Sequence, residues 1–319
     1  MQTIDQGGWI FQITDSGEAV LTECPQDGLV LTLPATVAGH PLTGIEHDAF
    51  DHAGPFEAFR VPNGHPAFAA RDGVLFDRSG ERLIRYPHRR AATAYTVPDS
   101  VRMIEASAFA GAEGLQRVTV PEGVARIEMY AFTDCPELTE IDLPASLSRV
   151  GHELFRGSKR LAAVHLPAGH PFLRVEDGCL VDRKENMLLV CLPGTGPQTL
   201  VTPENIRYVD DYAFYGCHKL RKIHLHRGLR TLGRYAFYHC AELTSVELPE
   251  GLRSIGVRAF SGCEQLKTLY IPDSVTSIEY KAFNNCTRLV LLVNKGSYTD
   301  RYCRQFGFPC RHRIQWPWH

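Results

Sequence analysis

The stretch LTSVELPEGLRSIGVRAFSGC, residues Leu243–Cys263, decides the fold of this chain of 319 residues. It opens on Leu-x-x-Val-x-Leu-Pro, continues with the apolar pair Leu252 and Ile255, and ends on Ala-Phe-x-x-Cys. The Val-Glu-Leu alternation at 246–248 predicts a strand, and the proline after it ends the pairing because it has no N–H to donate. The apolar pair predicts a second, brief strand on an opposite wall. Ala-Phe-x-x-Cys is expected to form a helical turn whose Phe fills the space between the walls.

The same unit recurs along most of the chain. Phe260 follows Phe237 by 23 residues, and Phe283 follows Phe260 by 23. The Phe of this motif stands at Phe50, Phe109, Phe132, Phe155, Phe214, Phe237, Phe260 and Phe283, preceded by Ala except at Leu154-Phe155. Self-similarity at this period predicts a leucine-rich-repeat solenoid, because one unit cannot bury its apolar face alone and must stack. The expected fold is β-rich, with a parallel sheet of stacked repeats.

Two longer gaps interrupt the period. Phe50 to Phe109 and Phe155 to Phe214 are both 59 residues, so each gap adds 36 residues (59 − 23) to one repeat. The added segments, about 63–93 and 168–198, resemble each other: in each, two alternating runs flank a polar turn. This pattern predicts two matched β-hairpin inserts.

The repeat core, the Leu-Pro strand ends and the Asp-Gly-x-Leu inserts resemble the BspA-like leucine-rich-repeat family of bacterial, often surface-associated, proteins. The hairpin expected within Gly8–Thr22 and the Gly-Ser-Tyr start of a short helix at 296–298 resemble that family's caps. One solenoid domain over residues 1–319 is expected. It has an N-terminal cap at 1–44, repeats at 45–293, and a C-terminal cap and tail at 294–319.

Composition narrows the classes of partner. The net charge of −2 gives no overall attraction to nucleic acid, so no nucleic-acid partner is expected. Apolar runs are too short for a membrane span. The start, Met1–Asp5, lacks a basic region followed by an apolar one. As given, the chain is therefore expected to be cytoplasmic, or at the cell surface or secreted if an export signal has been removed.

The cysteines follow the repeat. Five of the ten stand three residues after the repeat Phe, where other units have Ala112 or Ser158. A position that accepts Cys, Ala or Ser predicts a small buried slot in which free Cys acts as a small hydrophobe. The thiols should point the same way, so disulfide geometry would be poor. Packing is the expected role, with metal or redox use as the alternative.

No Gly-x-Ser-x-Gly elbow, phosphate-binding glycine loop or Cys-x-x-Cys pair is present, so we expect no enzyme and no cofactor. The outward face of the long sheet is the expected binding surface, and its partner a protein. A glycan or a cell-surface adhesion role is the alternative. The outward side chains of this sheet are polar and chemically varied, as those of a binding surface would be. Any solvated sheet face has similar side chains. The candidate ligand-binding residues are Arg117, Thr119, Glu140, Asp142, His165, Lys222, His224, Glu247 and Tyr270.

Three local features leave alternatives open. Residues 212–241 contain no Asp or Glu, so they could hold an anion or be a basic coil offset by acidic neighbours. His224 and His226 could point to one side of a strand and hold a metal, but no third ligand is assured and no metal site is expected. The tail tryptophans, Trp316 and Trp318, could bind a partner or fold back over the last coil.

Overall fold

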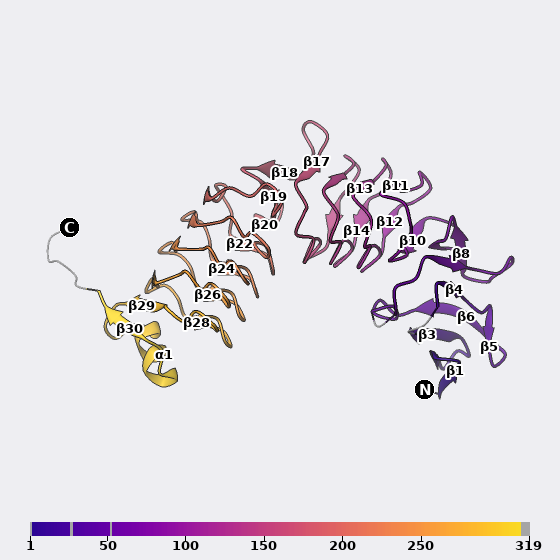
Figure 1. Cartoon of the computed structure of the whole chain (residues 1–319), viewed down its shortest axis with the longest axis horizontal. Coiled ribbons are helices and arrows are strands. Elements are labelled where there is room, and N and C mark those ends of the chain that lie inside the picture. The colour runs from indigo at the N-terminus through magenta and orange to yellow at the C-terminus, as the bar shows by residue number, and fades with distance from the viewer. Residues whose placement is uncertain (1, 26–27, 52, 314–319) are drawn as a thin grey trace. The chain divides into compact units, whose positions relative to one another are not determined.

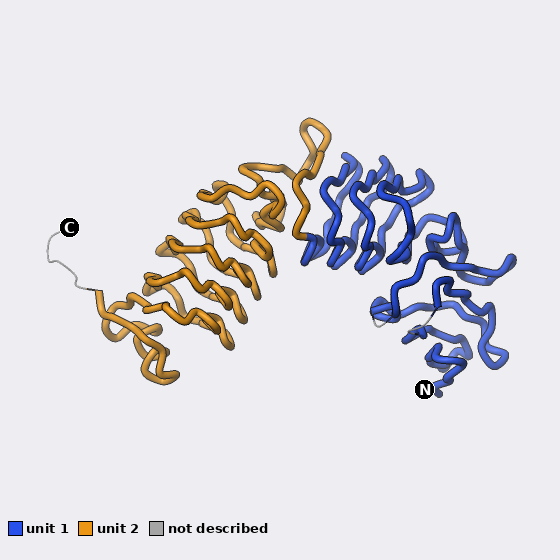
Figure 2. Tube along the Cα trace, in the orientation of Figure 1, with its two compact units in different colours: residues 1–158 blue, residues 159–319 orange. Residues whose placement is uncertain are grey.

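The computed structural model describes residues 2–25, 28–51 and 53–313. It divides into two compact units, residues 1–158 and 159–319, coloured blue and orange in Figure 2. In both, successive coils follow one another as rungs (Figure 1), and strands of one coil pair with those of the next. The predicted stacked-repeat solenoid is confirmed. The two expected cap boundaries and the single domain remain predictions.

Unit 1 begins with a mixed sheet of order β1-β2-β3-β6-β5, beside which β4 pairs with β7. The antiparallel pair β2 and β3 is the hairpin expected at the N-terminus, and β1 adds a further antiparallel strand to it. The bounds of these strands are β1 (Gln2–Gln6), β2 (Trp9–Ile13), β3 (Ala19–Glu23), β4 (Val30–Thr32), β5 (Thr36–Val37), β6 (His40–Ile45) and β7 (Ala58–Arg60).

The rest of unit 1 forms two walls. The short strands form a sheet of order β16-β14-β12-β10-β9-β8, and β11, β13 and β15 pair in parallel on the other wall. The bounds are β8 (Phe68–Arg71), β9 (Val74–Asp77), β10 (Arg82–Arg85), β11 (Ala94–Thr96), β12 (Met103–Ile104), β13 (Arg117–Thr119), β14 (Arg126–Ile127), β15 (Glu140–Asp142) and β16 (Arg149–Val150).

Unit 2 repeats this plan with a sheet of order β18-β19-β20-β22-β24-β26-β28 on the short-strand wall, and β21-β23-β25 and β27-β29-β30 on the other. The bounds of the first strands are β17 (Ala163–His165), β18 (Leu173–Glu176), β19 (Cys179–Asp182), β20 (Met187–Cys191), β21 (Thr199–Val201), β22 (Tyr208–Val209) and β23 (Lys222–His224). The others are β24 (Thr231–Leu232), β25 (Ser245–Glu247), β26 (Ser254–Ile255), β27 (Thr268–Tyr270), β28 (Ser277–Ile278), β29 (Val290–Val293), α1 (Tyr298–Phe306) and β30 (Cys310–His312).

The core of each coil follows from the alternation along its strands. On β25 the middle residue, Val246, is buried, whereas Glu247 is exposed. Ile255 of β26 is buried on the other wall, and Phe260 lies fully buried in the same core. Burying these side chains between the walls is the main stabilising term, because isolated coils would expose them.

The Ala-Phe-x-x-Cys segment is not helical, contrary to the expectation from sequence. It is a run of turns, and its backbone N–H groups bond to the neighbouring coil as well as within the segment. The N–H of Phe237 donates to the carbonyl of Ala259 at 2.7 Å, and that of Phe260 to Ala282 at 2.8 Å. Tyr235 has a positive φ of 55°. The segment therefore provides a third line of hydrogen bonds between coils, which a motif within one coil does not reveal.

The cysteine slot is confirmed as a packing position, because the cysteines in the described residues are free and those in the slot are buried. The Cys240 thiol donates to the Phe214 carbonyl at 3.2 Å, and the Cys263 thiol to Phe237 at 3.2 Å. Where serine replaces cysteine, the Ser158 hydroxyl donates to the Phe132 carbonyl at 2.6 Å. The slot thus selects a small side chain that can satisfy one backbone carbonyl.

Both hairpin inserts are confirmed, and each has one more strand than the sequence indicated. β8-β9-β10 and β18-β19-β20 are antiparallel, and their last strands pair in parallel with the short-strand walls at β12 and β22. At the C-terminus, Ser297 caps α1 by accepting a hydrogen bond from the N–H of Asp300, as expected. The tail tryptophans lie outside the described residues.

Candidate binding surfaces

In unit 1, the structure brings four predicted residues together on β13 and β15. The register places Arg117 opposite Glu140, and Thr119 opposite Asp142. Arg117 forms ion pairs at 3.0 Å with both Glu140 and Asp142, and the Thr119 hydroxyl donates to Asp142 at 2.9 Å. The charged and polar groups of these four residues are therefore paired with one another across two neighbouring coils. A partner would have to break these contacts to bind the same atoms.

In unit 2, Lys222 and His224 lie exposed on β23, and Glu247 lies beside them on β25. His224 and Glu247 form a hydrogen-bonded pair at 2.5 Å, with about half or more of both side chains exposed (54% and 68%). Lys222 has no ion pair within the described part of the chain. This face therefore keeps more of its polar groups available to a partner than the equivalent face of unit 1.

Two further predicted residues lie on other strands of unit 2. Tyr270, on β27, donates its hydroxyl to Glu250 at 3.1 Å, and the Arg313 guanidinium lies over its ring at 4.3 Å from the centroid. Burial raises the pKa of the Tyr270 hydroxyl, which therefore stays protonated. His165 lies exposed on β17.

A row of tyrosines on unit 2 was missed from the sequence. Tyr212 stacks on Tyr235 with ring centroids 4.7 Å apart, and Tyr215 lies 5.7 Å from Tyr238. These residues flank the Ala-Phe dipeptide of successive coils. The signal was available, because Tyr-Ala-Phe-Tyr occurs at 212–215 and again at 235–238. We call these four residues the tyrosine edge.

The structure separates the basic residues of 212–241. Lys222 lies on β23 and Arg221 pairs with Glu242 at 3.4 Å, whereas His226, Arg227 and Arg230 line one cavity of about 580 Å³ together with Glu204. His224 and His226 also have different partners, since His226 accepts a hydrogen bond from the N–H of Gly228. These residues do not form a single anion-binding patch.

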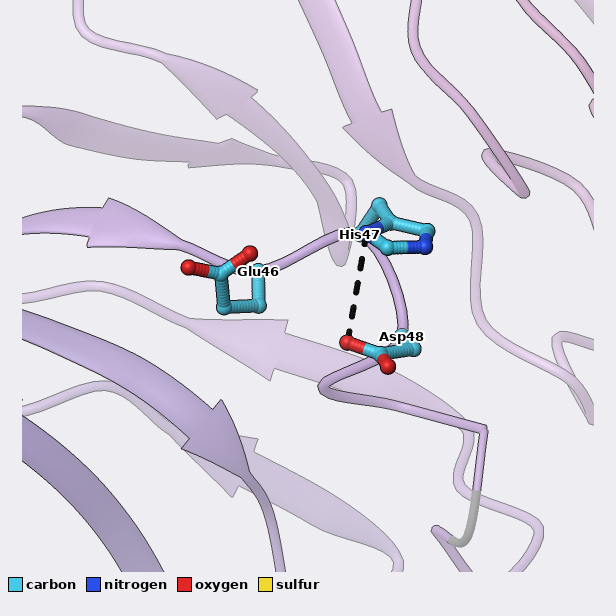
Figure 3. Close-up of side chains that lie close together, drawn as sticks. All are labelled: Glu46, His47 and Asp48. Carbon is cyan, nitrogen blue, oxygen red and sulfur yellow. Dashed lines mark ion pairs between the residues drawn. The ribbon is translucent and has the colours of Figure 1, made fainter.

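One group with metal-ligand spacing occurs in the described part of the chain, just after β6. Ligand atoms of Glu46, His47 and Asp48 lie within 4.8 Å of one another, and Figure 3 marks the 4.0 Å pair between His47 and Asp48. All three residues are exposed. Exposed acidic groups gather often without an ion, so this group by itself indicates no metal site.

The sequence model of the BspA-type leucine-rich-repeat region matches residues 88–179 and 194–300, with six copies. The chain belongs to this family. Members of this BspA-type family are non-catalytic repeat proteins that generally act in protein interaction or adhesion. The resemblance inferred from the repeat motif is thereby confirmed.

Solved structures share the fold of this BspA-type chain. A leucine-rich cell surface protein from Faecalibacterium prausnitzii is 17% identical, with a TM-score of 0.65 over 99% of this chain and 96% of that one. The pneumococcal vaccine antigen PcpA is 20% identical, with a TM-score of 0.66 over 98% and 88%. No curated protein matches the sequence. In the described residues, no helix has the length and apolar character needed to cross a membrane.

Proposed function

We propose that this protein is a non-enzymatic module that binds another protein through the strand face of unit 2. The face is centred on Lys222, His224, Glu247 and Tyr270. The observation that carries the proposal is a contrast along the strands. The inward residues Ile223, Val246 and Leu269 are all apolar and buried, whereas the outward residues beside them differ in charge and shape from coil to coil.

The chemistry of this face suits a protein partner. Tyr270 and Arg313 form a cation–π pair, and tyrosine and arginine are enriched among the residues that carry most of the affinity in protein interfaces. Lys222 and the exposed His224–Glu247 pair supply charges that can select a complementary partner. The equivalent face of unit 1 is less favourable, because Arg117 is already held by Glu140 and Asp142.

A glycan partner is favoured less. Sugar rings usually pack on an open aromatic face, but the Tyr270 face is covered by Arg313. The stacking of Tyr212 on Tyr235 likewise covers one face of each ring. The Faecalibacterium protein that shares this fold is a cell surface protein, which supports a place at the cell surface, where such a module would serve adhesion.

The test compares two variants with four substitutions each. Lys222, His224, Glu247 and Tyr270 are changed to Ala in one, and Arg117, Thr119, Glu140 and Asp142 in its matched control. Both proteins are immobilised and exposed to lysate and surface extract of the source organism, and captured proteins are quantified by mass spectrometry. We expect the unit 2 variant to lose a specific partner by about tenfold or more, and the control to retain it.

Circular dichroism and thermal unfolding would verify that both variants keep the fold. A third variant, with the tyrosine edge changed to Ser, tests whether another surface of unit 2 is the binding site. Loss of the partner only in this third variant would move the site away from the strand face. Identical capture by the unchanged protein and all three variants would refute the proposed surface.

A further inference from the structure

Within the described residues, Arg85 is a buried arginine without a carboxylate partner. It ends β10, in the first hairpin insert, and only 3% of it is exposed. Its guanidinium donates to the Ser107 carbonyl oxygen and to Nε2 of His88, the latter at 3.0 Å. Its Nε–H has no acceptor in the described part of the chain. Since a guanidinium has five N–H donors, these two hydrogen bonds leave most of its capacity unused.

The charge of Arg85 persists at neutral pH. Burial lowers its pKa to about 10, while the more distant carboxylate of Asp51 opposes this shift. His88 adds no second positive charge beside Arg85, because burial and the nearby Arg85 lower the pKa of its imidazole to about 4. Buried charges are normally paired, whereas among the described residues Arg85 has only the Phe50 ring, 5.9 Å from its Cζ, and the Asp51 carboxylate beyond ion-pair distance to offset its charge. An anion in contact with the guanidinium would complete this pairing.

The fold itself does not require an arginine at this position. The second insert follows the first by 105 residues, so Val190 corresponds to Arg85. The two strands have equivalent registers, with Arg85 opposite Leu75 and Val190 opposite Leu180. Val190 is also buried. An apolar side chain therefore fills this place in a matched hairpin of the same protein.

Arg85 lines two cavities of unit 1, which share this residue and His47. The larger has a volume of about 810 Å³ and lies between β6 and the insert, and the smaller has about 390 Å³. The larger cavity falls in the size range of small-molecule sites. Its apolar lining is contributed by Ile45, Phe50, Phe68 and Ile84.

Of the other charged residues of the larger cavity, Glu46 and His47 are exposed, and Arg78 is exposed and donates to the Pro66 carbonyl. Arg82 pairs with Glu105, and Asp77 accepts hydrogen bonds from the Ser79 hydroxyl and the Arg82 N–H. Arg85 is therefore the buried positive charge that remains for a ligand.

We propose that this cavity binds a small organic monocarboxylate with an apolar body, whose carboxylate pairs with the unused N–H groups of Arg85. A carboxylate matches the planar donor pattern of a guanidinium. A single negative charge balances the single buried positive charge, whereas a phosphate dianion would bring excess negative charge close to Asp51, Asp77 and Glu46. The apolar body packs against Phe50 and Phe68. This site is independent of the strand face of unit 2.

Fluorine NMR with 4-fluorophenylacetate tests the proposal, and the uncharged 4-fluorophenylacetamide serves as the matched probe. We expect the full-length protein to broaden the resonance of the acid but not of the amide. Arg85→Val introduces the residue that the second insert has at Val190, and Arg85→Lys keeps a charge but loses the planar donors. Each should weaken binding of the acid by about tenfold or more.

Arg126→Met is the control, because Arg126 lies exposed on β14 of the same sheet and lines neither cavity. It should bind the acid as the unchanged protein does. Equal broadening by acid and amide, undiminished binding by Arg85→Lys, or no broadening at a large excess of probe would each overturn the proposal. Thermal unfolding of the variants without probe separates lost binding from lost folding.

Discussion

At the scale of the residue, the cysteine slot shows how one carbonyl selects a side chain. The repeat predicted a small apolar residue, and the structure adds that the thiol or hydroxyl donates to the carbonyl of the preceding coil. Burial raises the pKa of the Cys135 thiol to about 12, so this cysteine stays protonated and unreactive near neutral pH. Packing and one hydrogen bond explain why cysteine and serine share this position.

Cys240 provides the direct test of the slot. Cys240→Ser should change the free energy of unfolding by about 1 kcal/mol or less, because the hydroxyl can donate to the Phe214 carbonyl as Ser158 does to Phe132. Cys240→Leu should cost about 1–3 kcal/mol or more by overpacking a fully buried site. Urea unfolding measures both. Equal costs for the two substitutions would contradict a size-selective slot.

At the scale of the element, the two inserts have the same turn in different surroundings. Asp72-Gly73 and Asp177-Gly178 are two-residue hairpin loops, and all four residues have positive φ, as a type I′ turn requires. These loops join β8 to β9 and β18 to β19. The hairpins predicted from the sequence are instead β9–β10 and β19–β20, around the polar turns at 78–81 and 183–186, and both are present. The third strand of each insert was missed, because β8 and β18 have only four residues each and β8 (Phe-Ala-Ala-Arg) shows no alternation of apolar and polar residues.

Alanine at the two glycines should separate turn strain from packing. Gly178→Ala is expected to cost about 1 kcal/mol, since its Cβ would meet only Pro197 at 3.8 Å and the cost is that of positive φ. Gly73→Ala should cost about 2–3 kcal/mol, because its Cβ would also lie 2.9 Å from the Ala58 Cβ. Thermal unfolding measures which substitution destabilises the protein more. A larger cost for Gly178→Ala than for Gly73→Ala would contradict the close approach of β7 to the first insert.

At the scale of the whole molecule, the repeat Phe side chains form stacks that run along each unit. In unit 2, Phe237 lies between Phe214 and Phe260, with centroid distances of 4.6 and 5.1 Å. In unit 1, Phe132 lies between Phe109 and Phe155, at 4.9 and 5.6 Å. Because a repeat contacts only its neighbours, damage to one stack should remain close to its origin.

Phe237→Ala should therefore destabilise unit 2 by about 3–5 kcal/mol and leave unit 1 largely unaffected. Hydrogen exchange measured by mass spectrometry should show lost protection in residues 159–313, with residues 2–158 unchanged. Phe132→Ala is the matched variant and should give the opposite pattern. Equal loss of protection throughout the chain in both variants would instead support the single cooperative domain expected from the sequence.

The sequence by itself determined the repeat period, the buried columns, the hairpin inserts and the start of the C-terminal helix, because each follows from local spacing of apolar, proline, glycine and capping residues. Only the tertiary structure decided which polar groups of neighbouring coils form hydrogen bonds and ion pairs with one another. Arg117 is engaged by Asp142 of the next coil, and the Ala-Phe turns bond between coils instead of forming helices. The burial of Arg85 likewise depends on packing of the insert against residues near Phe50. Such contacts join distant parts of the chain, so side-chain periodicity does not specify them.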